Sequence, residues 1–515
     1  RWTLDLTASN ERYDSTSNTL ASVVGYDLRN IAKADDGTDL PPNVAPGIAG
    51  DCSMGQTPWG TIITAEENVQ GYYGDLETSW NSNNRFLTGR GFDPGSLIEL
   101  DVAPSEFSAY GLISNPDERK DKDNYGFLVE IDPGVDPSTY YVSVNEGGDG
   151  SGHRKLGVMG RVRWENCTFA MGDDFKLLPN QPVVIYGAND RRSGRIYKWV
   201  SEGNYVPGMT KGEVRALLDT GSLYVAHFED LEVSTGLTLA STGEAPTEET
   251  RGIGRWIEIS LDSTDTPPNA AALGAPDTTV GQALQDVNWN GIGGYASQND
   301  LLATLFTAGN KLGVTETNRP EDLEYNPLGG PVAGLPARLF IAFTNHTRPT
   351  ACNQDGVLDA TTVSRQDADG AIFVIEEGAN DTPAASGTFT YWQAWKGGVP
   401  GEGEDGLFVA GDPDNLAIDI QGGVWFGTDG HAGSTGDTRS DAIYYLDLDP
   451  SRKAGEEGVV FPTFGLPFRV IGSPSDSEAT GPWFTPDQTT LFFNVQHPGE
   501  DFINTPSTWP PLSAK

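Results

Sequence analysis

The chain has 515 residues, and 73 acidic against 33 basic side chains give it a formal net charge of −40. A surface this acidic repels phosphate backbones and anionic membranes, so a nucleic-acid-binding protein is not expected. No stretch of about 18 apolar residues occurs, which argues against a membrane-spanning helix within the sequence. Hydrophobic residues make up 37% of the chain, enough for a buried core at this length.

Cysteine and histidine are scarce, with three and five copies in the whole chain. Three cysteines do not make a disulfide framework, although they allow one bridge. No two histidines have the spacing of a zinc site on a helix. The surplus of carboxylates fits either a solvated surface or the binding of hard cations such as calcium, which prefer oxygen ligands.

Short strands are predicted along the whole chain, because apolar or β-branched runs are bounded by Gly, Pro, Asp and Asn. One kind of run ends in a polar cluster, as in VVIYGAND, and the other ends in an acid-rich turn, as in RIYKWVSEG. The best helix candidate is 210–221. In chain order, the predicted strands cover 61–68, 125–133, 183–190, 195–203, 255–263, 339–346, 371–381, 423–430, 442–450 and 490–497.

The alternation of these two kinds of strand predicts an all-β fold and favours a β-propeller, in which the polar ends of the inner strands meet near one axis. Two β-sandwiches and a β-helix are the alternatives. Sandwiches do not explain the polar clusters at matching strand ends, and the loops are too irregular for a β-helix. We expect one domain over 1–515, with loops near 76–102 and 231–251 as insertions on one face.

Carboxylates recur at the polar ends of the predicted strands and in the turns that lead into them. Clustered carboxylates repel one another unless cations bind among them, so a cation site follows if the fold brings them together. The alternative is that each one caps a turn and faces water. The residues concerned are Glu66, Glu67, Asn68, Glu130, Glu165, Glu321, Asp322, Asp412, Asp414, Asn415, Asp429 and Glu478.

Two further motifs bear on metals. The segment DVNWNG (286–291) begins like a calcium loop, but Ser297 stands where the loop needs an acidic residue, so a turn is favoured. Cys52 lies in a Gly- and Pro-rich stretch that reads as a loop before the first inner strand. A lone cysteine is usually a small buried hydrophobe, whereas a thiolate beside carboxylates binds a transition metal.

Several long segments resemble PhoX-type alkaline phosphatases. The first is CSMGQTPWGTIITAEEN, which begins at Cys52, and the last is EATGPWFTPDQTTLFFNVQHPGE, which begins at Glu478. Between them lie LLDTGSLYVAHF (217–228), RPEDLEYNP (319–327) and DPDNLAIDIQGGVWFGTDG (412–430). The resemblance implies a six-bladed propeller that is secreted or periplasmic, and it implies a centre of ferric and calcium ions.

The family resemblance also implies roles for individual residues. Cys52 matches the cysteine that bridges the irons, and Arg163 is the expected phosphate clamp, with Arg192 as a second candidate. The implied carboxylate ligands are Glu67, Glu130, Glu165, Glu321 and Glu478, together with Asp412 and Asp414.

The sequence departs from the family pattern at RWENC around Glu165 and at Gly194, where an acid is common, and the family's usual N-terminal stretch is missing. Because of these departures, the resemblance does not determine whether one of the calcium ions is bound or how the substrate pocket is formed. Arg1 begins the chain without a signal segment, so we expect one to have been removed.

The implied function is hydrolysis of small phosphomonoesters, with a metal-bound oxide or hydroxide as the nucleophile, in an exported protein. The alternative is a non-catalytic, calcium-binding propeller that acts as a binding or structural module. The sequence leaves the oligomeric state open.

Overall fold

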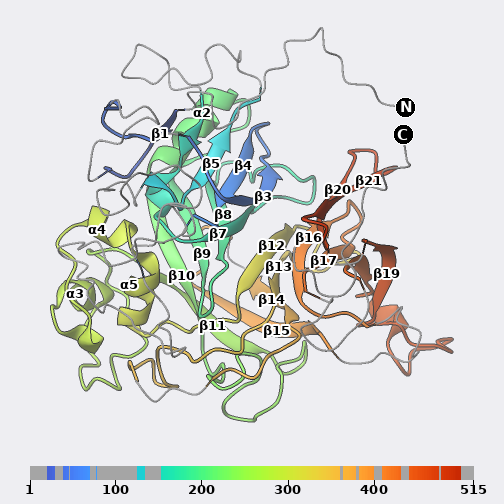
Figure 1. Cartoon of the computed structure of the whole chain (residues 1–515). Coiled ribbons are helices and arrows are strands. Elements are labelled where there is room, and N and C mark those ends of the chain that lie inside the picture. The colour runs from blue at the N-terminus through green and yellow to red at the C-terminus, as the bar shows by residue number, and fades with distance from the viewer. Residues whose placement is uncertain are drawn as a thin grey trace, which may run out of the picture.

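The computed structural model describes residues 20–28, 39–45, 47–69, 77, 124–133, 152–359, 364–378, 382–398, 409–430, 440–474 and 477–499. Over these residues the protein is mostly β, with a few short helices at one side of the strands (Figure 1). The predicted loop at 76–102 lies almost wholly outside the described residues. No helix in the described ranges is long and apolar enough to cross a bilayer.

The described strands form three sheets. The first sheet has the order β2-β1-β6-β5-β4-β3. Its only parallel pair among the described strands is β1 with β6, and the other neighbours are antiparallel. The strands are β1 (Ala21–Val23), β2 (Val44–Ala45), β3 (Asp51–Gln56), β4 (Ile62–Glu66), β5 (Leu128–Ile131) and β6 (Arg154–Lys155).

The second sheet joins two antiparallel meanders, β7 to β11 and β12 to β15, through the pairing of β11 with β15. The predicted insertion at 231–251 is the connection between β10 and β11. The strands are β7 (Trp164–Phe169), β8 (Pro182–Asn189), β9 (Ile196–Asn204), β10 (Gly221–Phe228), β11 (Gly252–Glu258), β12 (Pro320–Asn326), β13 (Arg338–Phe343), β14 (Ala371–Glu377) and β15 (Thr388–Lys396).

The third sheet contains the meander β16 to β19 and the hairpin β20–β21, which joins it through β17. Three sheets of six, nine and six strands are fewer units than six separate blades, so the six-bladed propeller stays a prediction. The strands are β16 (Pro413–Ile418), β17 (Val424–Thr428), β18 (Ala442–Leu446), β19 (Pro467–Gly472), β20 (Glu478–Phe484) and β21 (Leu491–Gln496).

Each of the ten predicted strands overlaps an observed strand. In most of them the apolar run is buried, whereas the residues of β21 keep partial or full exposure. The predicted helix is also confirmed as α2 (Lys211–Ala216), where Thr210 and Glu213 form a reciprocal capping box. Among the described residues, three short helices were missed, α3 (Val280–Gln285), α4 (Gln298–Leu302) and α5 (Leu305–Leu312). Short 3-10 helices cover Gly157–Met159, Leu217–Asp219, Trp289–Gly291 and Pro450–Arg452.

The calcium-like loop at 286–291 is a turn, as predicted, and a lysine supplies its positive charge. Lys311 Nζ donates hydrogen bonds to the carbonyl oxygens of Asp286 and Ile292, at 2.6 and 2.7 Å. Lys311 lies on α5, and its side chain is buried beneath the turn. An ammonium group thus bonds to loop carbonyls of the kind that a bound cation would use.

Five strands that the sequence analysis did not predict lie at the centre of the fold. They are β3, β7, β12, β16 and β20, and each is the strand before or beside a predicted one. Contacts run from β3 to β7, from β7 to β12, from β12 to β16 and from β16 to β20. These strands escaped prediction because they carry polar residues at positions where an ordinary strand carries apolar ones. They are the strands that build the site.

Candidate metal centre

Four of the central strands contain an irregularity at the same place. The pairing register shifts between Asp51 and Met54 in β3, between Trp164 and Cys167 in β7, and at the start of β12 and β16. Each shift is a β-bulge, which bends a strand and re-aims the side chains within it. The bulged segments read DCSM (51–54), WENC (164–167), PEDL (320–323) and PDNL (413–416).

The second residue of each bulged segment is a predicted metal ligand. These residues are Cys52, Glu165, Glu321 and Asp414, and each therefore faces the centre from an equivalent position. The expectation that Cys52 lies in a loop before the first strand was wrong, since it belongs to β3. The fifth central strand, β20, begins with Glu478, another predicted ligand.

The third residue of three bulges ties its strand to the next one. Asn166 Nδ2 donates to the carbonyl of Leu323 on β12 at 3.1 Å. Asp322 accepts a hydrogen bond from the backbone N–H of Leu416 on β16 at 2.8 Å. Asn415 in turn accepts from the backbone N–H of Gly481 on β20 at 2.9 Å. These bonds fix the spacing of the bulges, and hence the spacing of the ligands beside them.

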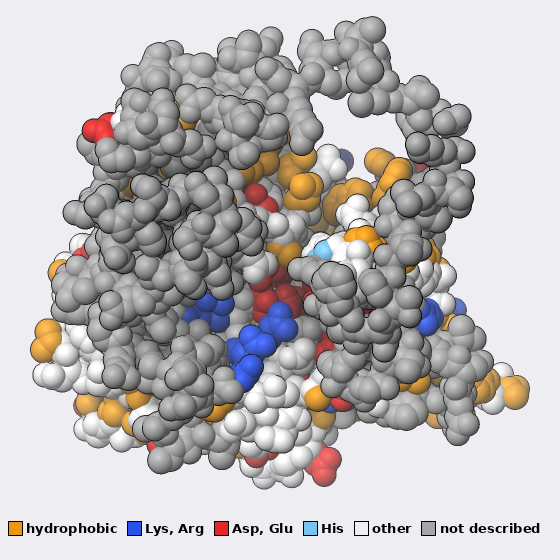
Figure 2. Space-filling view, in the orientation of Figure 1, with side chains coloured by type: hydrophobic (Ala, Val, Ile, Leu, Met, Phe, Trp, Pro, Cys, Tyr) orange, Lys and Arg blue, Asp and Glu red, His pale blue; other side chains and the backbone are white. Residues whose placement is uncertain are grey.

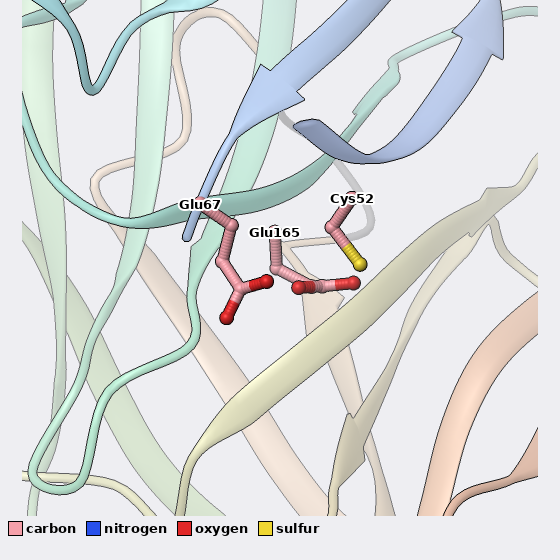
Figure 3. Close-up of side chains that lie close together, drawn as sticks. All are labelled: Cys52, Glu67 and Glu165. Atoms are coloured by element: carbon pink, nitrogen blue, oxygen red, sulfur yellow. The ribbon is translucent and has the colours of Figure 1, made fainter. Parts of the chain in front are cut away.

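The acidic groups and the thiol converge into three overlapping sets, each with its ligand atoms within 4.8 Å of one another. The sets share members, so they form a continuous row from Cys52 to Glu478. Figure 3 shows the first set, with the Cys52 sulfur and the carboxylates of Glu67 and Glu165 pointing toward one another. The sets are Cys52–Glu67–Glu165, Glu165–Glu321–Asp414 and Asp414–Asp429–Glu478.

The electrostatics of this row favour neutral acids when no cation is bound. Burial and the charges of Glu67 and Asp414 raise the pKa of Glu165 well above its usual value. Burial and the charges of Glu478 and Asp429 do the same to the pKa of Asp414. Removal from bulk water and the Glu165 carboxylate also raise the pKa of the Cys52 thiol. Repulsion of this kind disappears when cations bind between the groups.

The donor set fits bound metal ions. Both carboxylate oxygens of Glu165 and Oδ1 of Asp414 are buried without a hydrogen-bond partner in the described part of the chain. Unpartnered buried carboxylate oxygens are costly unless something else pairs with them. One thiol and several carboxylates suit a site that takes both a transition metal and hard cations.

Arginines border the acidic row on one side. Arg319 makes two hydrogen bonds to Asp190, at 3.0 and 2.8 Å, and one ion pair to Glu321 at 2.7 Å. Burial alone raises the pKa of Asp190, but its pairing with Arg319 holds the pKa below the usual value. Arg319 and Arg163 hold equivalent places, each directly before a bulged segment.

The acids and arginines line one cavity of about 340 Å³. The phosphate-clamp candidates Arg163 and Arg192 both lie on its wall, as do the predicted ligands Cys52, Glu67 and Glu165. Figure 2 shows this face of the molecule, with blue side chains beside red ones in a central hollow. The cavity is also lined by Asn68, Arg191, Arg319, Glu321, Asp190, Asp414, Asp429, Glu478, Gln496 and His497.

Several cavity residues were missing from the predicted site. Asp190 and His497 are the last residues of predicted strands that finish in polar clusters, so this pattern pointed to them. Asp429 was already among the candidate carboxylates and lacked only an assigned ligand role. Arg319 was overlooked although it opens the segment RPED. Its backbone has a φ of 44°, as Asp412 has 45°, and both residues precede a proline and a bulge. The signal that finds them is the repeat of X-Pro-acid-polar-Leu in two strands.

Asp412 therefore occupies the repeat position of Arg163 and Arg319, not that of the ligands. It is buried beside the row, where it accepts a hydrogen bond from Asn345 at 2.9 Å. The three metal-sized sets in the described residues do not include it. Its ligand role stays a prediction, whereas Asp414 lies within two of the sets.

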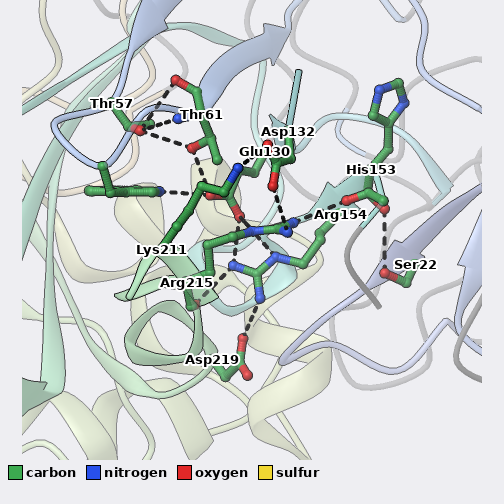
Figure 4. Close-up of polar contacts among 12 residues, drawn as sticks. Ser22, Thr57, Thr61, Glu130, Asp132, His153, Arg154, Lys211, Arg215 and Asp219 are labelled. Atoms are coloured by element: carbon green, nitrogen blue, oxygen red, sulfur yellow. Dashed lines mark hydrogen bonds and ion pairs between the residues drawn. The ribbon is translucent and has the colours of Figure 1, made fainter. Parts of the chain in front are cut away.

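The structure does not bring Glu130 to the row. Glu130 lies on β5, fully buried, where Trp59 and Thr61 donate to one oxygen and Arg154 and Arg215 donate to the other. Figure 4 shows this network around the two arginines. Although burial raises the pKa of Glu130, the arginines hold it below its usual value. Both oxygens already have partners, so its ligand role has no support from the geometry.

Gly194 stands where the family commonly has an acid, and the backbone leaves no room for one. A Cβ atom at this position would lie 2.1 Å from the carbonyl oxygen of Asn189 and 2.7 Å from that of Arg191. Its N–H bonds to Arg191, closing a tight turn that presents Arg191 and Arg192 to the cavity. The turn thus requires glycine for steric reasons.

All three cysteines are free thiols in the structure, so the bridge that the sequence allowed does not form. Cys167 and Cys352 are buried, and burial raises the pKa of each thiol. Cys52 differs because the residue as a whole keeps contact with solvent on β3, while its sulfur lies among the carboxylates of Glu67 and Glu165.

Comparison with known proteins places this geometry in context. The structure is similar to that of Pseudomonas fluorescens PhoX in complex with vanadate, a transition state analogue, with a TM-score of 0.63 and 24% identity over 96% of this chain and 72% of that one. A search of curated proteins gave no match. The sequence model of the family described as alkaline phosphatase PhoX matches residues 1–499. Because that match covers nearly the whole sequence, the chain belongs to the alkaline phosphatase PhoX family.

Proposed function

We propose that the cavity is the active site of a metal-dependent phosphomonoester hydrolase of the alkaline phosphatase type. The observation that carries this proposal is the meeting of two charge patterns in one cavity. A row of acids and a thiol that fits cations lies beside arginines that fit a phosphate group. Membership of the PhoX family and the vanadate complex of the similar structure support the same activity.

The arginines bind and orient the phosphate group. Arg163 and Arg192 lie on the cavity wall, and Arg319 is held in one orientation by its two bonds to Asp190. Guanidinium groups fixed in this way offset the charge that develops on phosphoryl oxygens, at no cost of reorganisation. A substrate phosphate would then meet cationic groups on one side and the acidic row on the other.

The row would hold ferric and calcium ions. Cys52, Glu67 and Glu165 form the set with a soft thiolate, which suits iron. The two other sets have only carboxylate oxygens, which suit calcium. Bound cations would supply Lewis acidity and lower the pKa of water in the cavity. No serine nucleophile is needed for this chemistry.

The setting of the site follows from the same assignment. We propose that the central strands belong to a six-bladed propeller that forms one domain over 1–515. Calcium is plentiful outside the cytoplasm, so we also propose a periplasmic or secreted protein. Its partners would be small phosphate esters and not nucleic acid, because the net charge of −40 repels polyanions.

Metal analysis and a phosphatase assay test the proposal together. We expect iron and calcium in the purified protein, turnover of a phosphomonoester, and loss of turnover after chelation of calcium. Full activity in metal-free protein would refute the mechanism. Calcium without iron, and no turnover, would favour the alternative of a non-catalytic binding module.

A further inference from the structure

A second cavity, of about 590 Å³, adjoins the acidic one. The two cavities share Cys52 and Gln496 in their linings. The second cavity lies between β3 on one side and β20 and β21 on the other, where Figure 1 shows the first and last sheets facing each other. We call it the side groove, and its walls include Met54, Gln56, Trp483, Phe492 and Asn494.

The direction of the side groove follows from strand periodicity. On β3, Met54 and Gln56 are exposed and share one face, because alternate side chains beyond the bulge point the same way. Cys52 lies within the bulge and lines both cavities. On β21, the exposed residues are Phe492, Asn494 and Gln496. Cys52 and Gln496 mark the end at the acidic cavity. Gln56 and Phe492 therefore mark the far end, roughly 13 Å along the strands.

On the side formed by β20 and β21, the lining changes from polar to apolar along this direction. Close to the acidic cavity lie Gln496, Asn494 and Thr480. Farther along, Met54, Trp483 and Phe492 expose 62%, 47% and 54% of their surface. Large apolar side chains gathered in a groove mark a binding surface more often than chance exposure does. Figure 2 shows hydrophobic side chains close to the charged hollow.

The two aromatic residues of the side groove are neighbours across two strands. Trp483 and Phe492 are directly paired across β20 and β21. Side chains at directly opposed positions of two antiparallel strands lie within about 5.5 Å at their Cβ atoms, so the two rings form one apolar surface.

Two acids at the groove floor do not oppose an apolar ligand. Asp322 accepts backbone hydrogen bonds from Leu323 and Leu416, at 2.7 and 2.8 Å. Glu324 accepts one from the hydroxyl of Thr168 at 3.0 Å. These groups are engaged with the protein, so the surface that stays open to a ligand is chiefly the aromatic wall.

We propose that the side groove binds the ester group of the substrate and selects phosphomonoesters with an extended apolar ester group. The proposal rests on the phosphatase function proposed above. With the phosphate group held among the arginines and the metal row, the ester group leaves the acidic cavity past Cys52 and Gln496. It then lies along Met54 and against Trp483 and Phe492.

A series of n-alkyl phosphates tests the proposal: ethyl, butyl, hexyl and octyl phosphate. Burial of each methylene group is expected to raise kcat/KM about fourfold until the chain passes Phe492. Trp483→Ala and Phe492→Ala should flatten this dependence and lower the octyl-to-ethyl ratio at least tenfold. Val460→Ala is the control, because Val460 is 98% exposed and does not line the groove. It should keep the wild-type ratio.

The n-alkylphosphonates, which cannot be hydrolysed, separate this proposal from the proposed function. Their dissociation constants, measured by calorimetry on the metal-loaded protein, should fall with chain length in the wild type and not in Trp483→Ala. This result without turnover of any phosphate ester would uphold the side groove and overturn the phosphatase. Turnover and binding that are both independent of chain length would overturn the side groove and leave the phosphatase standing.

A pair of isosteres decides between apolar and cationic recognition. Choline phosphate and 3,3-dimethylbutyl phosphate have the same shape, but only the first has a positive charge. The proposal predicts a higher kcat/KM for the dimethylbutyl ester. A preference for choline phosphate that is lost in Glu324→Gln would mean that the groove binds a cationic ester group through Glu324. This result would overturn the proposal.

Discussion

Two of the regions that bury carboxylates neutralise them in different ways. Around Glu130, Arg154 and Arg215 donate to the carboxylate at 2.7–3.0 Å. In the acidic row, Glu165 has no hydrogen-bond partner for either oxygen among the described residues. The first region lowers the pKa of its central acid, and the second raises it.

The difference shows what makes a buried acid a candidate ligand. Glu130 and Glu165 are both fully or almost fully buried on strands, at 0% and 1% exposure. Burial therefore does not distinguish them, and the presence of a partner charge within the protein does. A charge that the fold already balances stabilises the fold, whereas a charge left unbalanced has to be balanced by a bound ion.

The largest effect is expected for Cys52→Ser. A serine oxygen lacks the softness and charge donation of a thiolate, so bound iron should fall to near zero. Loss of the metals' contribution of several kcal/mol should lower kcat roughly a thousandfold. Because Cys52 is exposed on an edge strand, the melting temperature should stay close to that of the wild type.

Cys167→Ser is the matched control for that variant. Cys167 is buried in the main core, so its replacement should cost about 1–3 kcal/mol of stability and leave iron per chain unchanged. Iron content, melting temperature and phosphatase rate are measured on both. Normal iron and normal rate in Cys52→Ser would remove the most distinctive residue from the metal centre.

The next largest effect contrasts Glu130→Gln with Glu165→Gln. Glu130→Gln leaves Arg154 and Arg215 without their buried counter-charge, which should cost about 3 kcal/mol in the free energy of unfolding. Bound metal should not change. Glu165→Gln should instead lower bound metal and leave the stability of metal-free protein within about 1 kcal/mol, because neighbouring carboxylates already disfavour its charge. Denaturant titration and elemental analysis of both variants measure these outcomes. Loss of bound metal in Glu130→Gln would contradict the prediction and show that Glu130 is a metal ligand.

A smaller effect concerns the pH dependence of the arginine region. Burial and the positive charge of Arg215 lower the pKa of His153 from 6.5 to about 4. The unfolded chain then binds a proton that the folded chain does not, so stability falls as pH drops from 6.5 toward 4. We expect a loss of roughly 2 kcal/mol over this range that is absent in His153→Gln. Denaturant unfolding of the wild type and of His153→Gln at both pH values measures this loss. An equal change of unfolding free energy with pH in the two proteins would contradict the assignment to His153.

The smallest effect separates arginines that serve the substrate from arginines that serve the fold. Arg163→Lys should raise KM for a phosphate ester about tenfold, because lysine does not bind phosphate in the two-point manner of a guanidinium group. Its unfolding free energy should not change. Arg154→Lys should leave KM unchanged and lower the free energy of unfolding, because Arg154 bonds to Glu130, Asp219 and a backbone carbonyl. An unchanged KM in Arg163→Lys would leave Arg192 and Arg319 as the phosphate contacts.

The sequence predicted the strands that have apolar runs, such as β8 and β13, because their burial on both faces gives a continuous signal. It did not predict β7 or β12, because WENC and PEDL place polar residues in the middle of a strand. In both strands the polar residues lie in a bulge, where side chains leave the normal alternation. The resemblance to a family, and not periodicity, pointed to their acids.

Sequence patterns also could not distinguish the two adjacent glutamates of TAEEN, Glu66 and Glu67. Glu66 pairs with Lys155 at 2.6 Å in the interior, and Glu67 lies in the acidic row. Adjacent residues at a strand end point to opposite sides, so a shift of one position separates a structural ion pair from a candidate ligand. Only the register of β3 with β4 decides which glutamate faces the cavity.

By itself, the sequence determined that this is an acidic, mostly β protein, and its resemblance to a family supplied most of the candidate ligands. These conclusions depend on local properties of the sequence, namely net charge, apolar runs and the segments that resemble the family. The tertiary structure decided which acids meet, that Glu130 is balanced by arginines, and that Arg319 and Asp190 join the cavity. Those outcomes depend on contacts between strands more than a hundred residues apart, since the charge that each buried acid meets comes from another part of the chain.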